Sequence, residues 1–134
     1  AGLSPIICIG EKNRDQSGAY FEVIKQQLAS ALADVDGSQA KQIIIAYEPV
    51  WAIGADKPMG AIHMHEMSLF IRKFLFEKYG KRGHTMPVLY GGAILDTVHA
   101  VEMVRESEID GFLLGRMSLD AEKLATLFSA LARF

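Results

Sequence analysis

The sequence predicts an α/β fold, built as one domain over residues 1–134 from four parallel strand–helix units. Four short apolar runs of strand length alternate with four stretches in which apolar residues recur at helical spacing. The short runs lack polar alternation, which is typical of strands buried on both faces of a parallel sheet. No linker rich in Pro, Gly or Ser divides the chain, so right-handed crossovers are expected between successive strands.

The first two units occupy the N-terminal part of the chain. Strands are expected at residues 6–9 and 42–47, where Ile dominates. The first strand is followed by an amphipathic pattern, formed by Tyr20, Ile24, Leu28, Leu32 and Val35. The second strand is followed by a similar pattern, formed by Met67, Phe70, Ile71, Phe74 and Leu75.

The last two units follow the same scheme. Strands are expected at residues 88–90 and 111–114, and helices are expected to begin near Asp96 and Leu119. Ser118 and Asp120 have the side chains that cap helix N-termini, so both are candidate caps of the final helix. The apolar faces of these helices are formed by Val98, Val101, Val104, Leu124, Leu127, Phe128 and Leu131.

Composition excludes several classes of partner. The 14 Lys and Arg are scattered among 16 Asp and Glu, and the net charge of −2 favours neither nucleic acid nor an anionic membrane as a partner. No signal peptide or membrane-spanning segment is recognised, and cytoplasm is the expected location. The single cysteine, Cys8, has no intramolecular disulfide partner and is expected to pack in the core.

The histidines show no spacing typical of metal ligands, so no metal site is expected. Two of the four lie two positions apart on a predicted helix and therefore point to different faces. All four are expected to face solvent: His63, His65, His84 and His99.

Several sequence blocks together resemble one enzyme family. The longest is Tyr47-Glu-Pro-Val-Trp-Ala-Ile-Gly54, and Cys8-Ile-Gly-Glu11 precedes it. Val88-Leu-Tyr-Gly-Gly92 and Asp110-Gly-Phe-Leu-Leu-Gly115 follow. In this order they resemble the triosephosphate isomerase family over essentially the whole chain. Because the family fold is a (β/α)8 barrel of about 250 residues, the resemblance implies half of a TIM barrel, strand–helix units five to eight.

The resemblance also implies a reaction. Members of the family interconvert dihydroxyacetone phosphate and glyceraldehyde 3-phosphate through an enediolate, without a cofactor. Glu48, at the carboxyl end of a predicted strand, corresponds to the general base. Pro49 restricts the backbone that follows, so the carboxylate is aimed. Glu11 corresponds to a residue that supports the site structurally.

The remaining site residues implied by the resemblance form a lid and a phosphate site. The lid would exclude water from the reaction and comprises Pro49, Val50, Trp51, Ala52, Ile53, Ala55, Asp56 and Lys57. The hydroxyl of Tyr90 would latch it. The phosphate would be bound, mostly by backbone N–H groups, at Gly54, Gly92, Ala93, Gly115 and Arg116.

Five positions depart from the family pattern. Ala93 stands where the family has serine and Arg116 where it has glycine, and the lid is altered at Ala55, Asp56 and Pro58. Arg116 would bind phosphate, block a small ligand, or face solvent. The combination of Gly54-Ala55, Pro58 and Leu114-Gly-Arg116 also resembles a divergent branch that isomerises four-carbon ketose phosphates such as erythrulose phosphate, which is the alternative substrate.

The family places a catalytic lysine and histidine in its first four units, and no segment here matches either motif. A catalytically inactive half-barrel or fragment is therefore a second alternative. A half-barrel leaves strand edges and an apolar inner face unpartnered. A second copy of this chain in a homo-oligomer, a separate chain with the first four units, or a rearranged compact fold would cover them.

Overall fold

The structure is a computed structural model that describes residues 2–55 and 58–133. Its parallel sheet has the order β1-β2-β3-β4, which is also the order along the chain. The strands are β1 (Ile6–Ile9), β2 (Ile44–Tyr47), β3 (Val88–Tyr90) and β4 (Gly111–Phe112). All four predicted strands are confirmed, although the second and fourth are shorter than expected.

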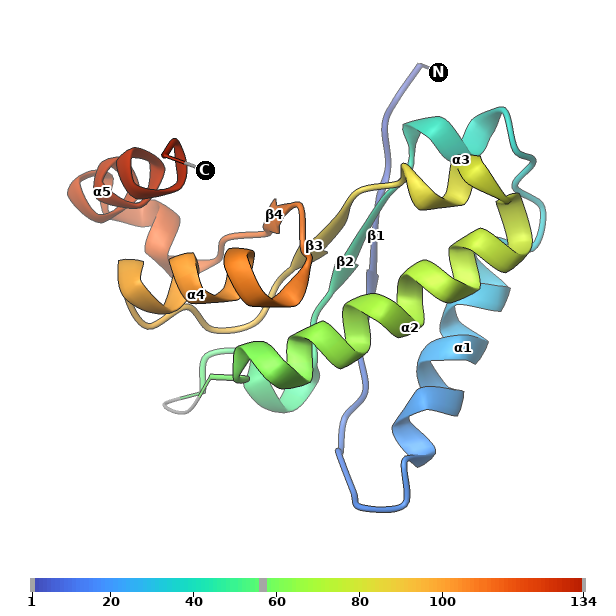
Figure 1. Cartoon of the computed structure of the whole chain (residues 1–134), viewed down its shortest axis with the longest axis horizontal. Coiled ribbons are helices and arrows are strands. Elements are labelled where there is room, and N and C mark those ends of the chain that lie inside the picture. The colour runs from blue at the N-terminus through green and yellow to red at the C-terminus, as the bar shows by residue number, and fades with distance from the viewer. Residues whose placement is uncertain (1, 56–57, 134) are drawn as a thin grey trace.

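Long helices alternate with the strands, as Figure 1 shows. They are α1 (Ala19–Ala31), α2 (Ala61–Tyr79), α4 (Thr97–Ser107) and α5 (Ala121–Leu131). A one-turn helix, α3 (Lys81–His84), follows α2 and was not expected from the sequence. Three short 3-10 helices complete the order: η1 (Gln39–Gln42), η2 (Val50–Ala52) and η3 (Arg116–Leu119).

The helix caps agree in part with the sequence. Asp96 caps α4 by accepting a hydrogen bond from the backbone N–H of His99 at 2.8 Å. Asp120 caps α5 in the same way, with the N–H of Lys123 at 3.1 Å. Ser118 does not cap α5, because it lies inside η3, where its hydroxyl donates to the carbonyl of Gly115. A 3-10 turn therefore separates β4 from the last helix.

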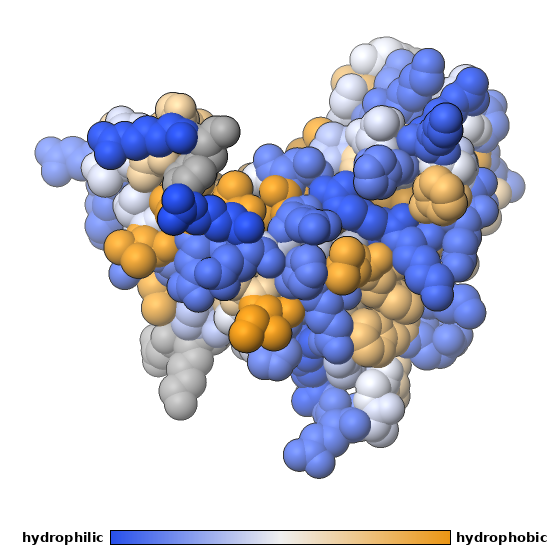
Figure 2. All heavy atoms as spheres, viewed as in Figure 1, coloured by the Kyte–Doolittle hydropathy of each residue, from blue (hydrophilic) through white to orange (hydrophobic). Residues whose placement is uncertain are grey.

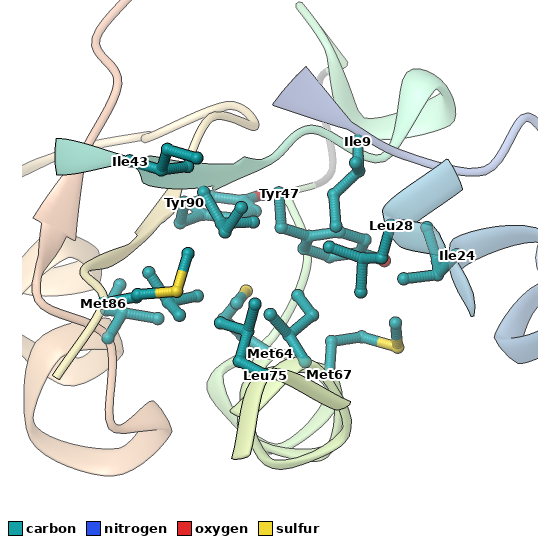
Figure 3. Packing of buried hydrophobic residues seen from close by; sticks show 14 of the residues in the cluster. Ile9, Ile24, Leu28, Ile43, Tyr47, Met64, Met67, Leu75, Met86 and Tyr90 are labelled. Atoms are coloured by element: carbon teal, nitrogen blue, oxygen red, sulfur yellow. The ribbon is translucent and has the colours of Figure 1, made fainter. Parts of the chain in front are cut away.

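The main core lies between the sheet and the helices that pack on it. Figure 3 shows Tyr47 and Tyr90 from the sheet facing Leu28 of α1 and Met64 of α2. All four are buried. The helical positions that the sequence pattern assigned to the core on α1 and α2 are largely buried here, so apolar burial is what holds these helices on the sheet.

β1 differs from the expectation of burial on both faces. Ile9 is 3% exposed, whereas Ile6 is 45% exposed and Cys8 is also exposed. Burial on both faces is therefore wrong for β1. Within the described residues, β1 pairs with β2 alone, and β4 pairs with β3 alone. The sheet is consequently open at both edges, and one face of β1 has no covering layer.

Candidate active site

Glu48 lies directly after β2, at the carboxyl end of the sheet. Its backbone N–H donates a hydrogen bond to the carbonyl of Ile9 at 2.7 Å. On the other side, the N–H of Gly91 donates to the carbonyl of Tyr47 at 2.8 Å. The predicted base is therefore held on a rigid strand end between the segments that follow β1 and β3.

Two glycines leave the space that Glu48 occupies. A Cβ atom on Gly10 would lie 1.8 Å from the backbone oxygen of Glu48. A Cβ atom on Gly91 would lie 2.3 Å from the Cγ atom of Glu48 and 2.9 Å from its carboxyl carbon. Both distances are far below van der Waals contact, so the position of this carboxylate depends on glycine at both sites.

Gly91→Ala is expected to lower the free energy of unfolding by about 1–3 kcal/mol, the usual cost of overpacking. The added methyl group must displace the Glu48 side chain or shift the backbone after β3. Urea unfolding followed by circular dichroism measures the loss. Gly60→Ala is the control, because a Cβ there meets no atom within 4 Å. Equal stability of the two variants would contradict the contact between Gly91 and Glu48.

The thiol of Cys8 lies beside the Glu48 carboxylate. The pKa of Cys8 is raised to about 11, first because Glu48 accepts its hydrogen bond, then because of burial and the negative charge of Glu48. The expectation that Cys8 is buried in the core is wrong, because its side chain lies on the open face of β1. Cys8 is instead an exposed thiol that remains protonated at neutral pH.

The raised pKa predicts slow alkylation of Cys8 by iodoacetamide below pH 9, because the thiolate is the reactive species. The rate should rise with pH to a midpoint near 11. In Glu48→Gln the carboxylate charge is lost, so the midpoint should fall toward the ordinary value of 9.0. Mass spectrometry of the alkylated protein gives both rates. An identical pH profile in the two proteins would show that Glu48 does not act on the thiol.

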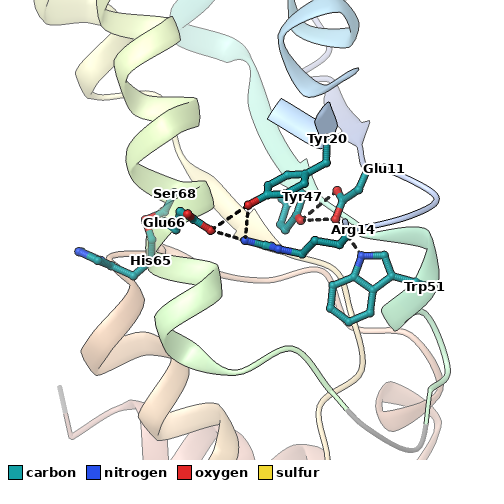
Figure 4. Close-up of polar contacts among 8 residues, drawn as sticks. All are labelled: Glu11, Arg14, Tyr20, Tyr47, Trp51, His65, Glu66 and Ser68. Carbon is teal, nitrogen blue, oxygen red and sulfur yellow. Dashed lines mark hydrogen bonds and ion pairs between the residues drawn. The ribbon is translucent and has the colours of Figure 1, made fainter. Parts of the chain in front are cut away.

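Glu11 joins the start of the lid to β2. The carboxylate, on a residue only 1% exposed, accepts hydrogen bonds from the hydroxyl of Tyr47 at 2.9 and 3.0 Å and from Nε1 of Trp51 at 2.8 Å. Its backbone carbonyl accepts from the N–H of Val50 at 2.9 Å. Burial, followed by the charge of Glu11, raises the pKa of Tyr47. Figure 4 shows the contacts of Glu11 with Tyr47 and Trp51.

A second polar cluster lies next to this one in Figure 4. The guanidinium of Arg14 forms an ion pair with Glu66 of α2 and lies 4.4 Å from the ring centre of Tyr20 on α1. The loop after β1 is thereby attached to two helices. No sequence spacing indicated this contact, because Arg14 and Glu66 are 52 positions apart.

A cavity of about 490 Å³ collects the residues expected to bind phosphate. All five of them line it: Gly54, Gly92, Ala93, Gly115 and Arg116. Ile53 and Ala55 of the lid also line it, whereas Pro49, Val50, Trp51 and Ala52 do not. Asp56 and Lys57 fall outside the described residues. Gly91 belongs to the same wall and contacts Glu48, so the cavity adjoins the predicted base.

Arg116 lies across the cavity from the β3–α4 loop and against the lid. A Cβ atom on Gly54 would lie 3.1 Å from its Nη2 atom, so the guanidinium covers the backbone there. Lys123 and Asp120 also line the cavity and form an ion pair at 3.2 Å. The added arginine therefore brings positive charge to the expected phosphate site.

Tyr90 and His99 meet Met59 just beyond the lid. The Tyr90 side chain is buried, and burial raises its pKa to about 12, an effect that the neighbouring backbone of Met59 partly offsets. Nε2 of His99 lies 3.2 Å from the carbonyl of Met59. The expectation that His99 faces solvent is therefore wrong. The spacing of the histidines does not indicate this contact, because Met59 and His99 are 40 positions apart.

The other histidines differ among themselves. His63 and His84 are exposed as expected, whereas His65 is half-buried, so the expectation that it faces solvent is only partly met. Across residues 2–55 and 58–133, no cluster of His, Cys, Asp or Glu has the geometry to hold a metal ion. No helix in those ranges is long and apolar enough to cross a membrane.

Comparison with known proteins assigns the family. A family profile described as Triosephosphate isomerase matches residues 1–131. The chain is 37% identical over 131 residues to a protein named Triosephosphate isomerase from Idiomarina loihiensis, covering 97% of this chain and 52% of that protein. It is 38% identical over 131 residues to one of the same name from Porphyromonas gingivalis, covering 96% and 52%. A third protein of that name, from Moorella thermoacetica, is 37% identical over 126 residues. The alignment covers 93% of this chain and 50% of that protein.

The matched region agrees with the observed architecture. The chain spans about half the length of the relatives it matches. Its four parallel strands, in sequential order and with a helix after each, correspond to half of a (β/α)8 barrel. From the profile match and these relatives together, the chain belongs to the triosephosphate isomerase family.

Proposed function

We propose that this chain carries the base and the phosphate-binding half of an isomerase that interconverts a small phosphorylated ketose and its aldose. Gly91 supports this most directly, because it lines the cavity and also touches Glu48. A phosphate held in the cavity would direct the carbon chain of the substrate toward that carboxylate. The name of the relatives, Triosephosphate isomerase, makes dihydroxyacetone phosphate and glyceraldehyde 3-phosphate the first substrates to test.

In this proposal Glu48 removes a proton from the carbon beside the carbonyl. The electrons of the broken C–H bond form the carbon–carbon double bond of an enediolate while the carbonyl π electrons move onto oxygen. Return of the proton to the neighbouring carbon, together with transfer of the hydroxyl proton from that carbon's oxygen to the former carbonyl oxygen, completes the exchange of aldose and ketose. No cofactor takes part. Polarisation of the carbonyl is assigned to the lysine and histidine that the family carries in its first four units, where preorganised donors stabilise the developing charge.

The proposal therefore needs the other half of the barrel. Open edges at β1 and β4, and the exposed Ile6 and Cys8, are the surfaces that four further strands would cover. In this proposal the four further strands come from a separate chain or from another part of the same protein. The alternative is a homo-oligomer, in which a second copy of this chain covers the same surfaces. We place the protein in the cytoplasm, where a lone cysteine remains reduced.

The test is turnover of triose phosphates by a preparation that holds this chain and the N-terminal four units of a relative. Erythrulose phosphate is assayed in parallel. Triose turnover is the expected result. Turnover of erythrulose phosphate alone would assign the four-carbon alternative, which rests on the resemblance of Gly54-Ala55, Pro58 and Leu114-Gly-Arg116 to the divergent branch. If the two halves are folded and associated but turn over neither substrate, the chain is the catalytically inactive half-barrel.

Arg116→Gly restores the residue common in the family and is expected to weaken binding of inorganic phosphate about 10- to 150-fold, because a hydrogen bond to a charged group is worth about 1.5–3 kcal/mol. Isothermal titration calorimetry measures the change. The control is Arg82→Ala, since Arg82 is an exposed arginine in α3, a different part of the fold. Unchanged phosphate affinity in Arg116→Gly would mean that the Arg116 side chain faces solvent and does not bind phosphate.

A further inference from the structure

We propose that His99 is a positioning residue that fixes the end of the lid to the phosphate-binding loop. The inference rests on the proposed function, because it concerns how the two walls of the phosphate cavity are held at a constant spacing. His99 lies in the first turn of α4, directly after the loop that runs from Gly91 to Asp96. Residues 91–95 of that loop all line the cavity.

The contacts of His99 define its tautomer. The N–H of Leu95 points to Nδ1 at 3.4 Å, so Nδ1 is the acceptor. A neutral imidazole carries its proton on the other nitrogen, and Nε2 therefore donates to the carbonyl of Met59 at 3.2 Å. The backbone N–H of His99 donates to Asp96 at 2.8 Å. Both ring nitrogens and the backbone are thus engaged, which holds the ring in a single orientation.

Met59 is a suitable point of attachment. It follows Pro58, where the chain leaves the lid, and it is only 1% exposed. The Tyr90 hydroxyl lies beside its backbone but forms no hydrogen bond with any described residue. The other end of the lid is attached to the same loop, because the N–H of Ala93 donates to the carbonyl of Ala52 at 3.0 Å. One hydrogen bond from the β3–α4 loop, at Ala93, and one from the first turn of α4, at His99, therefore bracket the described lid residues that line the cavity, Ile53, Gly54 and Ala55.

This arrangement has a consequence for ligand binding. An anion that contacts both Gly54 and Gly92 requires the same distance between the lid and the β3–α4 loop in every binding event. Loss of the His99 contact would free the Met59 end, and the ligand would then have to order it. Since one neutral hydrogen bond contributes about 0.5–1.5 kcal/mol, affinity should fall about two- to tenfold in His99→Ala.

The test uses the whole chain with inorganic phosphate as the probe. Trp51 is the only tryptophan, so its fluorescence reports on the start of the lid during the titration. Hydrogen exchange followed by mass spectrometry reports on peptides that contain residues 53–55. His99→Ala should weaken phosphate binding and speed exchange in those peptides, whereas His99→Gln, whose amide N–H can donate to Met59, should restore both. His84→Ala is the matched control, because His84 is exposed in α3.

Each outcome decides the inference. Unchanged exchange at residues 53–55 in His99→Ala would overturn it. Equal losses in the Ala and Gln variants, together with a lower melting temperature, would also overturn it, since they would show that the imidazole matters only for the start of α4. If the unaltered protein binds no phosphate, the proposed phosphate site fails, but faster exchange in His99→Ala alone would still support the attachment of Met59.

Discussion

Glu48→Gln is expected to reduce turnover about 10²- to 10⁴-fold in the preparation that holds both halves of the barrel, which is the range that general base catalysis contributes. Gln has nearly the shape of Glu, so the close contact with Gly91 persists, but the amide cannot accept the proton. Glu48 does not line the cavity proposed to hold the substrate phosphate, so the KM should change little. Steady-state kinetics separate these two effects.

The control for Glu48→Gln is Glu102→Gln, which alters an exposed carboxylate on α4. Turnover of that variant should equal that of the unaltered protein. The free energy of unfolding should be within about 0.5 kcal/mol for both variants, as is usual when no packing is lost. Retained turnover in Glu48→Gln would show that Glu48 is not the base. A raised KM with an unchanged kcat would show that Glu48 contributes to substrate binding instead.

Glu11→Ala is expected to lower the free energy of unfolding by about 2–6 kcal/mol. The Tyr47 hydroxyl and the Trp51 Nε1–H both donate to this carboxylate, whose residue is 1% exposed. Removing the acceptor leaves two donors without a partner, and each buried unsatisfied group costs about 1–3 kcal/mol. The start of the lid would also lose its attachment. Urea unfolding monitored through Trp51 and through circular dichroism measures both consequences.

Glu11→Gln provides the sharper comparison. Its side chain keeps one carbonyl oxygen, which can accept from Trp51, and its amide N–H can donate to the Tyr47 oxygen. Most of the stability should therefore return. The lost negative charge should also lower the pKa of Tyr47, since Glu11 is one cause of its rise. If the Ala variant unfolds at the same urea concentration as the unaltered protein, the hydrogen bonds of Glu11 contribute nothing to stability.

The strands were predictable because each short apolar run is bounded by polar or turn-forming residues. The open face of β1 was not, since Ile-Ile-Cys-Ile has the same composition whether one or two layers cover it. α3 was missed because one helical turn is too short to show apolar periodicity. Asp120 was identifiable as a cap, and Asp96 as the start of a helix, because Asp at a helix start provides an acceptor for an otherwise unpaired N–H.

The candidate site was predictable where it depends on contiguous sequence. Glu48 and the glycines of the cavity occur in short blocks that can be recognised directly. The contacts that organise them link distant positions, such as Cys8 with Glu48, Glu11 with Trp51 and His99 with Met59. No periodicity or spacing encodes such pairs, because the fold alone brings them together. For Gly91 a signal existed, since paired glycines often mark close backbone approach.

The most direct measurement is the exchange of a carbon-bound hydrogen of dihydroxyacetone phosphate with solvent deuterium, followed by proton NMR in D2O. It observes the proton transfer assigned to Glu48 and does not require the aldose to leave the site. The preparation with both halves should label the carbon beside the carbonyl, and Glu48→Gln should lose nearly all labelling while still binding phosphate. Labelling at equal rates in the two proteins would contradict the assignment of Glu48 as the base.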